Sequence, residues 1–203
     1  GQLRLQAYSH IANGANMVEY WHWHSIHNAI ESYWKGVLSH DLAPNRTYKE
    51  CSVVGNEWKR IGSHLVNLKK KNRVAVIASN EALTGLVEFP MQSKTADGYN
   101  TVLRWLCDAL YMMNIEYDII SSHSDNFSDY DYLFVPALYS ASENELKALD
   151  EYALNGGNLL VTFKSGFSDE HLKIYHDTQP HILCKTLGIK YDQFTYPTNV
   201  KIS

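Results

Sequence analysis

Apolar segments that read as strands alternate with amphipathic segments that read as helices from residue 72 onward, and this alternation constrains the fold most strongly. The predicted strands are residues 73–78, 116–120, 131–135 and 158–163, and the predicted helices are residues 99–113 and 142–154. Unbroken apolar strands between such helices indicate a mostly parallel sheet covered on both faces. We therefore expect an α/β fold, a flavodoxin-like or Rossmann-like doubly wound sheet, over residues 71–203.

The predicted helices of this half have recognisable faces and ends. The helix over residues 99–113 carries an apolar stripe at helical spacing, made of Leu103, Leu106, Leu110 and Met113. Ser142 and Glu145 have the spacing of a capping box, in which each satisfies a backbone N–H of the other. Residues 79–98, between the first strand and the first of these helices, are expected to form a loop.

The first 70 residues do not read as a closed domain. The pattern predicts a helix over residues 2–14 and a short strand over 17–21. It also predicts a second helix with Thr47 and Glu50 in capping-box positions and an apolar stripe from Tyr48 to Leu68. A lone strand between two helices has unpaired hydrogen-bonding edges on both sides. We therefore expect residues 1–70 to be part of a larger domain.

Residues 19–50 combine indoles, imidazoles and carboxylates in a mixture that a hydrophobic core does not need. The aromatic residues are Trp21, Trp23, Tyr33 and Trp34, and the polar ones between and after them include His22, His24, His27, Glu31, His40 and Asp41. Flat rings stack on the apolar C–H face of a pyranose, while polar groups bind its hydroxyls. The segment favours a sugar-binding wall, and a half-buried aromatic cluster at a domain seam is the alternative.

Two other chemistries are less well supported in this segment. The spacing of His22, His24 and His27 matches no established zinc pattern, so no metal site is expected. Glu31 and Asp41 have the residue types of a glycosidase pair, but nothing in the sequence fixes their separation. Asp41 is better suited to ordering the turn that follows it. Glu31 is the better functional candidate, and a solvated loop glutamate is its alternative interpretation.

Composition excludes several classes of partner. The formal net charge is −4 and the longest basic run is residues 69–71, which argues against a nucleic-acid surface. No stretch approaches the roughly 18 apolar residues of a membrane span. Cys51, Cys107 and Cys184 are odd in number and far apart, which is typical of buried, reduced thiols. With no signal peptide at the first residues, a cytoplasmic protein is expected.

The second half lacks the usual catalytic signatures. The segment after its first strand contains only Gly85 and Gly98, which fit neither a dinucleotide fingerprint nor a phosphate loop, so no cofactor is expected. Class I glutamine amidotransferases share this layout but need a cysteine at a strand-to-helix turn, where residues 163–167 read FKSGF. Ser165 does not lie in G-x-S-x-G either. We expect this half to be structural.

Two long motifs resemble glycoside hydrolase family 42 β-galactosidases. The run GQLRLQAYSHIANGANMVEYWHW, followed by ESYWKGVLSHDLAPNRTYKE, resembles the end of their catalytic TIM barrel. The run VPALYSASENELKALDEYALNGGNLLVTFKSGFSDE is similar to their second domain, an amidotransferase-like α/β module that mediates trimer formation. The resemblance implies that residues 1–70 end a TIM barrel and that residues 71–203 form the trimerisation domain of a homotrimer.

The resemblance also implies roles for single residues. Family members hydrolyse terminal β-galactosides with retention through two glutamates, both on barrel strands before the position of Gly1, so no catalytic residue is expected and the chain alone should be inactive. The residue at the position of Trp21 packs on the galactose ring, and the glutamate at the position of Glu31 binds its hydroxyls. Some relatives have histidine at the position of Trp34, which leaves the contact made by this indole open.

Two other functions stay open at this point. In the first, the chain is a self-standing scaffold whose α/β half forms an oligomer. In the second, the α/β half binds a small molecule in the crevice at the carboxyl ends of its strands, near residues 79–81 and 137–140.

Overall fold

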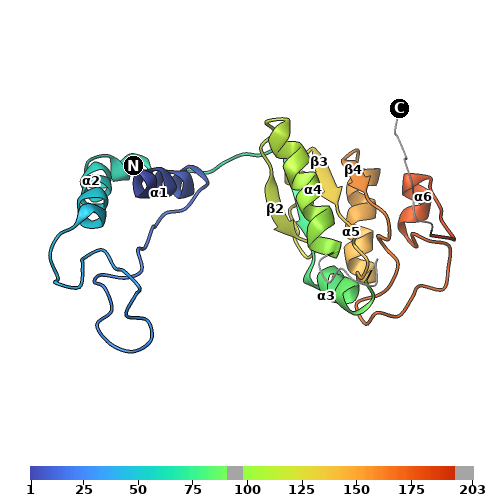
Figure 1. Ribbon diagram of the computed structural model, residues 1–203. Coiled ribbons are helices and arrows are strands. Elements are labelled where there is room, and N and C mark those ends of the chain that lie inside the picture. The colour runs from blue at the N-terminus through green and yellow to red at the C-terminus, as the bar shows by residue number, and fades with distance from the viewer. Residues whose placement is uncertain (91–97, 195–203) are drawn as a thin grey trace. The chain divides into compact units, whose positions relative to one another are not determined.

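The computed structural model describes residues 1–90 and 98–194, and the chain divides into two compact units (Figure 1). Unit 1 is Gly1–Lys71 and unit 2 is Asn72–Ser203. None of the helices in the described ranges is long and apolar enough to cross a membrane.

Unit 1 contains two packed helices and a short 3-10 turn. The helices are α1 (Gln2–Ala12) and α2 (Arg46–Ile61), and η1 (Gly62–His64) follows α2. The guanidinium of Arg4 donates to the Glu57 carboxylate at 2.9 Å, and the Tyr8 hydroxyl donates to the same carboxylate at 2.9 Å. The rings of Tyr8 in α1 and Trp58 in α2 also meet edge to face at 5.8 Å, and Ala7 and Val54 are both buried. Both predicted helices are present, but each is shorter than predicted: α1 ends at Ala12, and α2 ends at Ile61, before the end of its predicted stripe.

The predicted strand over residues 17–21 is wrong. The chain between α1 and α2 forms no named strand in the described structure, and its only ladder-like pairings are isolated bridges such as the one between His24 and Leu38. A strand needs a neighbour to pair with its N–H and C=O groups. No neighbouring strand is present in unit 1, so a run with strand-like composition does not form a strand.

The predicted capping box at Thr47 and Glu50 is also wrong. The side chain of Asn45 accepts a hydrogen bond from the N–H of Tyr48 at 3.0 Å, so Asn45 is the N-cap and Thr47 lies inside α2. Asparagine is among the strongest N-cap residues, and it lies two positions earlier. Glu50 instead accepts a hydrogen bond from the backbone N–H of Arg4 at 3.2 Å, which joins α2 to α1.

Unit 2 is built on a parallel four-stranded sheet, as predicted. Its strands are β1 (Val74–Ala78), β2 (Asp118–Ser121), β3 (Tyr132–Val135) and β4 (Asn158–Val161). Their order is β2-β1-β3-β4, and all three neighbouring pairs are parallel. The helices are α3 (Asn80–Glu88), α4 (Gly98–Met112), α5 (Glu143–Leu154) and α6 (Leu183–Leu187), and η2 spans Phe127–Asp129.

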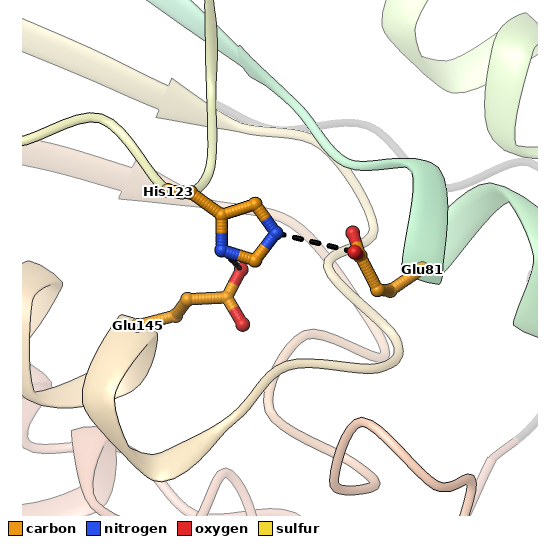
Figure 2. Close-up of side chains that lie close together, drawn as sticks. All are labelled: Glu81, His123 and Glu145. Atoms are coloured by element: carbon orange, nitrogen blue, oxygen red, sulfur yellow. Dashed lines mark hydrogen bonds and ion pairs between the residues drawn. The ribbon is translucent and has the colours of Figure 1, made fainter.

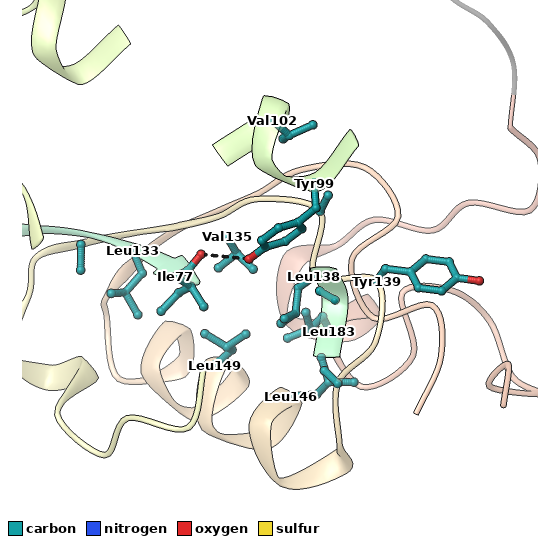
Figure 3. Packing of buried hydrophobic residues seen from close by; sticks show 14 of the residues in the cluster. Ile77, Tyr99, Val102, Leu133, Val135, Leu138, Tyr139, Leu146, Leu149 and Leu183 are labelled. Atoms are coloured by element: carbon teal, nitrogen blue, oxygen red, sulfur yellow. Dashed lines mark hydrogen bonds between the residues drawn. The ribbon is translucent and has the colours of Figure 1, made fainter. Parts of the chain in front are cut away.

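Helices pack against both faces of the central strand. Leu110 of α4 lies in one apolar cluster with Val74 and Val76 of β1. The opposite face of β1 carries Ile77, which lies in a second cluster with Leu146 and Leu149 of α5 (Figure 3). Because β1 is buried on both faces, every one of its first four residues is apolar and enclosed.

Local capping explains where the helices of unit 2 begin. The capping box of α5 is confirmed, since Ser142 and Glu145 each accept a hydrogen bond from the other's backbone N–H. The loop expected over residues 79–98 is wrong in its first part, which forms α3. There the Ser79 hydroxyl accepts a hydrogen bond from the N–H of Ala82 at 3.1 Å and starts the helix. The remaining part, residues 91–97, lies outside the described residues.

Part of the sheet face that carries Val76 stays uncovered. Ile119, Tyr132 and Leu160 lie on this face, by the register of the strands, and are 55%, 47% and 45% exposed. They belong to β2, β3 and β4, whereas the Val76 side chain between them is fully buried. The described structure therefore presents apolar side chains of three strands to solvent on one face.

Candidate functional site

Backbone hydrogen bonds close the aromatic loop, which we define as residues 21–38. The N–H of Val37 donates to the carbonyl of His22 at 2.8 Å, and the N–H of Leu38 donates to the carbonyl of Trp23 at 2.8 Å. In return, the N–H of Ser25 donates to the carbonyl of Leu38 at 3.0 Å. These bonds hold the beginning and the end of the aromatic loop side by side.

Two small residues inside this closure position the loop, and sequence reasoning missed both. The hydroxyl of buried Ser25 donates to the Leu38 carbonyl at 3.0 Å and accepts from the N–H of Gly36 at 3.2 Å. A Cβ atom at Gly36 would lie 2.4 Å from the carbonyl carbon of His24 and 2.5 Å from the oxygen of His22. Backbone atoms cannot yield at such distances, so only glycine fits. Neither role is visible without knowing which residues face each other.

The three candidate sugar-binding residues lie on this braced loop and face solvent. The side chains of Trp21 and Trp34 are 80% and 60% exposed, and Glu31 is also exposed. The N–H of Trp34 donates to the carbonyl of Glu31 at 2.8 Å, which brings these two residues into one turn. Trp21 lies at the closed end, where its ring stacks on His22 with centroids 5.0 Å apart and planes at 12°.

The aromatic rings of the loop do not build a core within unit 1. Tyr33 is almost fully exposed, and Trp23 makes an edge-on contact with Tyr48 of α2 at 6.3 Å between centroids while staying largely exposed. That contact joins the loop to the helix that follows. Large exposed apolar surfaces of this kind are typical of binding sites or interfaces.

Histidine rings and Asp41 order the aromatic loop and the turn that follows it, residues 39–43. The rings of His24 and His27 are 5.4 Å apart between centroids, and those of His27 and His40 are 5.8 Å apart. One nitrogen of each ring lies within hydrogen-bond distance of a backbone carbonyl in residues 25–40. The carboxylate of Asp41 accepts a hydrogen bond from the N–H of Ala43 at 3.0 Å, which confirms the predicted turn.

A second group of polar side chains meets at the carboxyl edge of the sheet in unit 2, and sequence reasoning did not find it. Figure 2 shows the His123 ring between the carboxylates of Glu81 and Glu145. Its Nε2 lies 3.1 Å from Oε1 of Glu81, and its Nδ1 lies 3.5 Å from Oε1 of Glu145. The hydrogen bond with Glu81 and the charge of Glu145 raise the pKa of His123. The backbone N–H of Glu81, assisted by His123, lowers the pKa of the Glu81 carboxyl.

The crevice expected for a small molecule exists only in part. Ser79, Glu81 and His123 line an open hollow of about 330 Å³ at the ends of β1 and β2. Residues 137–140 do not line it, because the chain after β4 covers them. The N–H of Gly166 donates to the carbonyl of Leu138 at 2.8 Å, so the expectation for that segment is wrong.

The cysteines and Ser165 have structural surroundings. Cys51, Cys107 and Cys184 are unpaired, as predicted, but they are partly rather than fully buried. Cys107 packs against the apolar cluster beneath α4. The hydroxyl of buried Ser165 accepts a hydrogen bond from the N–H of Leu138 at 3.0 Å, which fixes the turn after β4.

Comparison with known proteins matches both units. Residues 72–201 match the family described as "Beta-galactosidase trimerisation domain", and residues 1–61 match the one described as "Beta-galactosidase". The β-galactosidase BgaB of Geobacillus kaustophilus is 31% identical over 199 residues, which cover 97% of this chain and 29% of that protein. GanA of Bacillus subtilis, another β-galactosidase, is 29% identical over 172 residues, which cover 84% of this chain and 25% of that protein.

Solved structures give the same family. Gan42B, a GH42 β-galactosidase, matches with a TM-score of 0.78 and 28% identity, over 87% of this chain and 26% of its own. The β-galactosidase from Bacillus circulans sp. alkalophilus matches with a TM-score of 0.81 and 26% identity, over 90% of this chain and 27% of that protein. The chain thus spans about 29% of the length of BgaB, one of the curated relatives that it matches. By these matches, over both units, the chain belongs to the glycoside hydrolase family 42 β-galactosidases.

Proposed function

We propose that this chain supplies one wall of the galactose subsite and the oligomerisation domain of a retaining β-galactosidase that hydrolyses terminal β-D-galactosides. The observation that carries the proposal is the exposure of two indoles, Trp21 and Trp34, on a loop whose backbone is closed by hydrogen bonds. A loop whose backbone is held in place while its rings face solvent is pre-organised for stacking, since the backbone needs little further ordering on binding.

Each residue of the wall has a proposed task. Trp21 stacks on the C–H face of the galactose ring, and Glu31 accepts hydrogen bonds from its hydroxyls. Trp34 adds apolar area beside Glu31 in the same turn. These contacts accelerate hydrolysis only as far as they strengthen when the sugar becomes oxocarbenium-like. By the family resemblance, the acid/base and nucleophile glutamates precede the position of Gly1, so we expect the chain alone to be inactive.

The finer description of the two units belongs to the same proposal. Unit 1 corresponds to the end of a TIM barrel, and unit 2 to a flavodoxin-like, amidotransferase-like doubly wound domain. The strand order β2-β1-β3-β4 supports the latter, because flavodoxin-like sheets begin with this order. The three unpaired thiols support a reducing, cytoplasmic compartment.

We propose that unit 2 assembles the protein as a homotrimer. Its match to a trimerisation-domain family supports this, and so does the exposed apolar face formed by Ile119, Tyr132 and Leu160. Burial of such side chains against a second copy would remove apolar area from water, which is the main driving force of association.

Saturation-transfer NMR on the 203-residue chain tests the sugar wall. Methyl β-D-galactoside is compared with its C4 epimer, methyl β-D-glucoside. We expect transfer to the C–H protons of the galactoside, a loss of more than half of it in Trp21→Ala, and weaker binding in Glu31→Gln. Trp105→Ala, which removes an exposed indole of unit 2, is the matched control.

Two outcomes would contradict the proposal. Equal saturation transfer to both sugars, unchanged in Trp21→Ala, would show that this loop does not form a galactose subsite. Hydrolysis of a chromogenic β-galactoside by the chain alone, abolished in Glu31→Gln, would instead assign Glu31 to the catalytic machinery.

A further inference from the structure

The cluster at the carboxyl edge of unit 2 gathers three metal-ligating side chains from three separate segments. Glu81 lies in the first turn of α3 after β1, His123 follows β2, and Glu145 lies in the first turn of α5 after β3. The strands are parallel, so all three segments leave the sheet at the same edge. One donor atom from each residue lies within 4.8 Å of the other two, and Figure 2 shows the side chains converging.

Glu145 divides its two carboxylate oxygens between two tasks. Oε2 accepts hydrogen bonds from the N–H and the hydroxyl of Ser142, both at 2.8 Å. Oε1 is buried and accepts no hydrogen bond, on a side chain that is only 5% exposed. It points at His123, whose nearest nitrogen lies at ion-pair distance, 3.5 Å. A buried carboxylate oxygen without a hydrogen bond is costly, and a bound cation would satisfy it.

Glu81 repeats this arrangement. Its Oε2 accepts a hydrogen bond from the hydroxyl of Ser79 at 3.2 Å, and its Oε1 faces His123. Each carboxylate is therefore anchored through one oxygen by the serine that caps its helix, while the other oxygen faces the imidazole. In metal sites, outer hydrogen bonds of this kind orient the ligating carboxylates.

We propose that Glu81, His123 and Glu145 bind one divalent transition-metal ion of the zinc class, through Oε1 of each carboxylate and one imidazole nitrogen. Two carboxylates and a neutral imidazole carry two negative charges, which a divalent ion neutralises. Mixed nitrogen and oxygen donors suit Zn²⁺, whereas Mg²⁺ prefers oxygen ligands alone.

The ring of His123 has the freedom that the site requires. In the structure its two nitrogens face different carboxylates, so one nitrogen must turn to share an ion with both. The side chain is 57% exposed, and the open hollow beside Glu81 gives space for this rotation and for water ligands. A three-residue set completed by water is a common arrangement for zinc.

Zinc titration of the intact 203-residue chain tests the site. The chain is stripped with EDTA, and Zn²⁺ binding is measured by calorimetry and by the rise in melting temperature. We expect one equivalent to bind at this site, with Mg²⁺ at the same concentration giving no shift. Glu145→Gln is the decisive variant, because glutamine also completes a capping box and so preserves the helix start while removing the charged ligand.

Controls separate this cluster from the histidines of unit 1. Glu81→Gln, His123→Ala and Glu145→Gln should each lower Zn²⁺ affinity at least about tenfold. Three control variants should retain the equivalent that the cluster binds. They are His171→Ala, at an exposed histidine of unit 2 outside the cluster, Glu143→Gln, in the same turn of α5 as Glu145, and the double variant His24→Ala/His27→Ala. The proposal is overturned if Zn²⁺ binding is unchanged in Glu145→Gln, or if the parent binds no Zn²⁺ at 100-fold excess over protein. The second result would leave His123 as a protonated bridge between two carboxylates.

Discussion

The hydroxyl of Ser25 donates a hydrogen bond to the carbonyl oxygen of Leu38 at 3.0 Å, across thirteen residues of chain. The Ser25 side chain is buried although the indoles around it are exposed. The shape of the aromatic loop therefore depends on a small polar residue and on backbone pairing, while the large rings are left free to contact a ligand.

Replacing Ser25 by alanine should loosen the loop without unfolding the chain. The substitution removes the donor to Leu38 and the acceptor for the N–H of Gly36, and an unpaired buried polar group costs about 1–3 kcal/mol. Amide exchange measured by NMR should accelerate at Gly36 and Leu38 and stay unchanged in unit 2. Ser63→Ala, at an exposed position of unit 1, serves as the control. Unchanged protection in Ser25→Ala would contradict the bracing role.

Gly36→Ala and Gly55→Ala should have opposite effects on stability. The new methyl group at Gly36 would overlap backbone atoms of His22 and His24, so the loop must rearrange. At Gly55, inside α2, a methyl group meets nothing within 4 Å, and alanine favours a helix over glycine by about 0.5–1 kcal/mol. Urea unfolding followed by tryptophan fluorescence measures both. Equal tolerance of the two substitutions would show that the loop is not held as described.

Tyr99→Phe should destabilise unit 2 at neutral pH and less so in alkali. The N–H of Ser79 donates to the Tyr99 hydroxyl at 2.8 Å, and loss of this buried partner costs about 1–3 kcal/mol. Burial raises the pKa of Tyr99 to about 12, from 10. The contribution of the hydroxyl is therefore fully present below pH 10 and is lost as the pH rises toward 12.

Urea unfolding at pH 8 and pH 11 measures this pH dependence. The free-energy difference between the parent and Tyr99→Phe should narrow by about 1 kcal/mol at pH 11. Exposed Tyr111, changed to phenylalanine, is the control and should give no such narrowing. A difference that is constant with pH would argue against burial of the Tyr99 hydroxyl.

Glu57→Gln should weaken the packing of α1 on α2 at neutral pH but not in acid. Hydrogen bonds from Arg4, then from Tyr8, lower the pKa of the Glu57 carboxyl. Because the pKa is lower in the folded chain than the unfolded value of 4.5, the ionised carboxylate stabilises the fold at any pH above 4.5. This contribution is lost as the pH falls through the lowered pKa of the folded state. Amide exchange in α1 should be faster in the variant than in the parent at pH 7 and similar at pH 3. Exposed Glu19→Gln should change neither.

Leu160→Lys should dissociate the proposed trimer. The substitution places a charge on the exposed apolar sheet face, where burial against a second copy would leave it unpaired. Sedimentation velocity should show a smaller species than the parent at equal concentration. Leu154→Lys, at the exposed end of α5, should sediment like the parent. A variant at position 160 that assembles normally would place the interface elsewhere.

Two features with a clear sequence pattern were predictable, namely a helix cap and a series of apolar strands that alternate with helices. The capping box of Ser142 and Glu145 and the parallel sheet follow from spacing and apolar runs, and both are confirmed. The strand expected over residues 17–21 fails because a strand depends on neighbours that a single segment does not specify. The predicted start of α2 is wrong for another reason. Both Asn45 and Thr47 have side chains that can cap a helix, and in the structure Asn45 does so.

The candidate sites were predictable to different degrees. Trp21, Glu31 and Trp34 stood out as chemistry-bearing residues, and their proposed roles came from the family resemblance. Ser25 and Gly36, which hold the loop, could not be predicted, because both act through contacts between the beginning and the end of the loop. The cluster around His123 was invisible for the same reason, since its members become neighbours only after the sheet has formed.

The two oxygens of the Glu145 carboxylate act on different parts of the molecule at the same time. One oxygen holds the beginning of α5, and the other faces His123. A change in the charge near His123 therefore acts on the same carboxylate that caps the beginning of α5. A glutamate that completes a capping box can thus have a second role through its other oxygen. The sequence alone does not distinguish the two roles, whereas substitution by glutamine does, because glutamine keeps the cap and removes the charge.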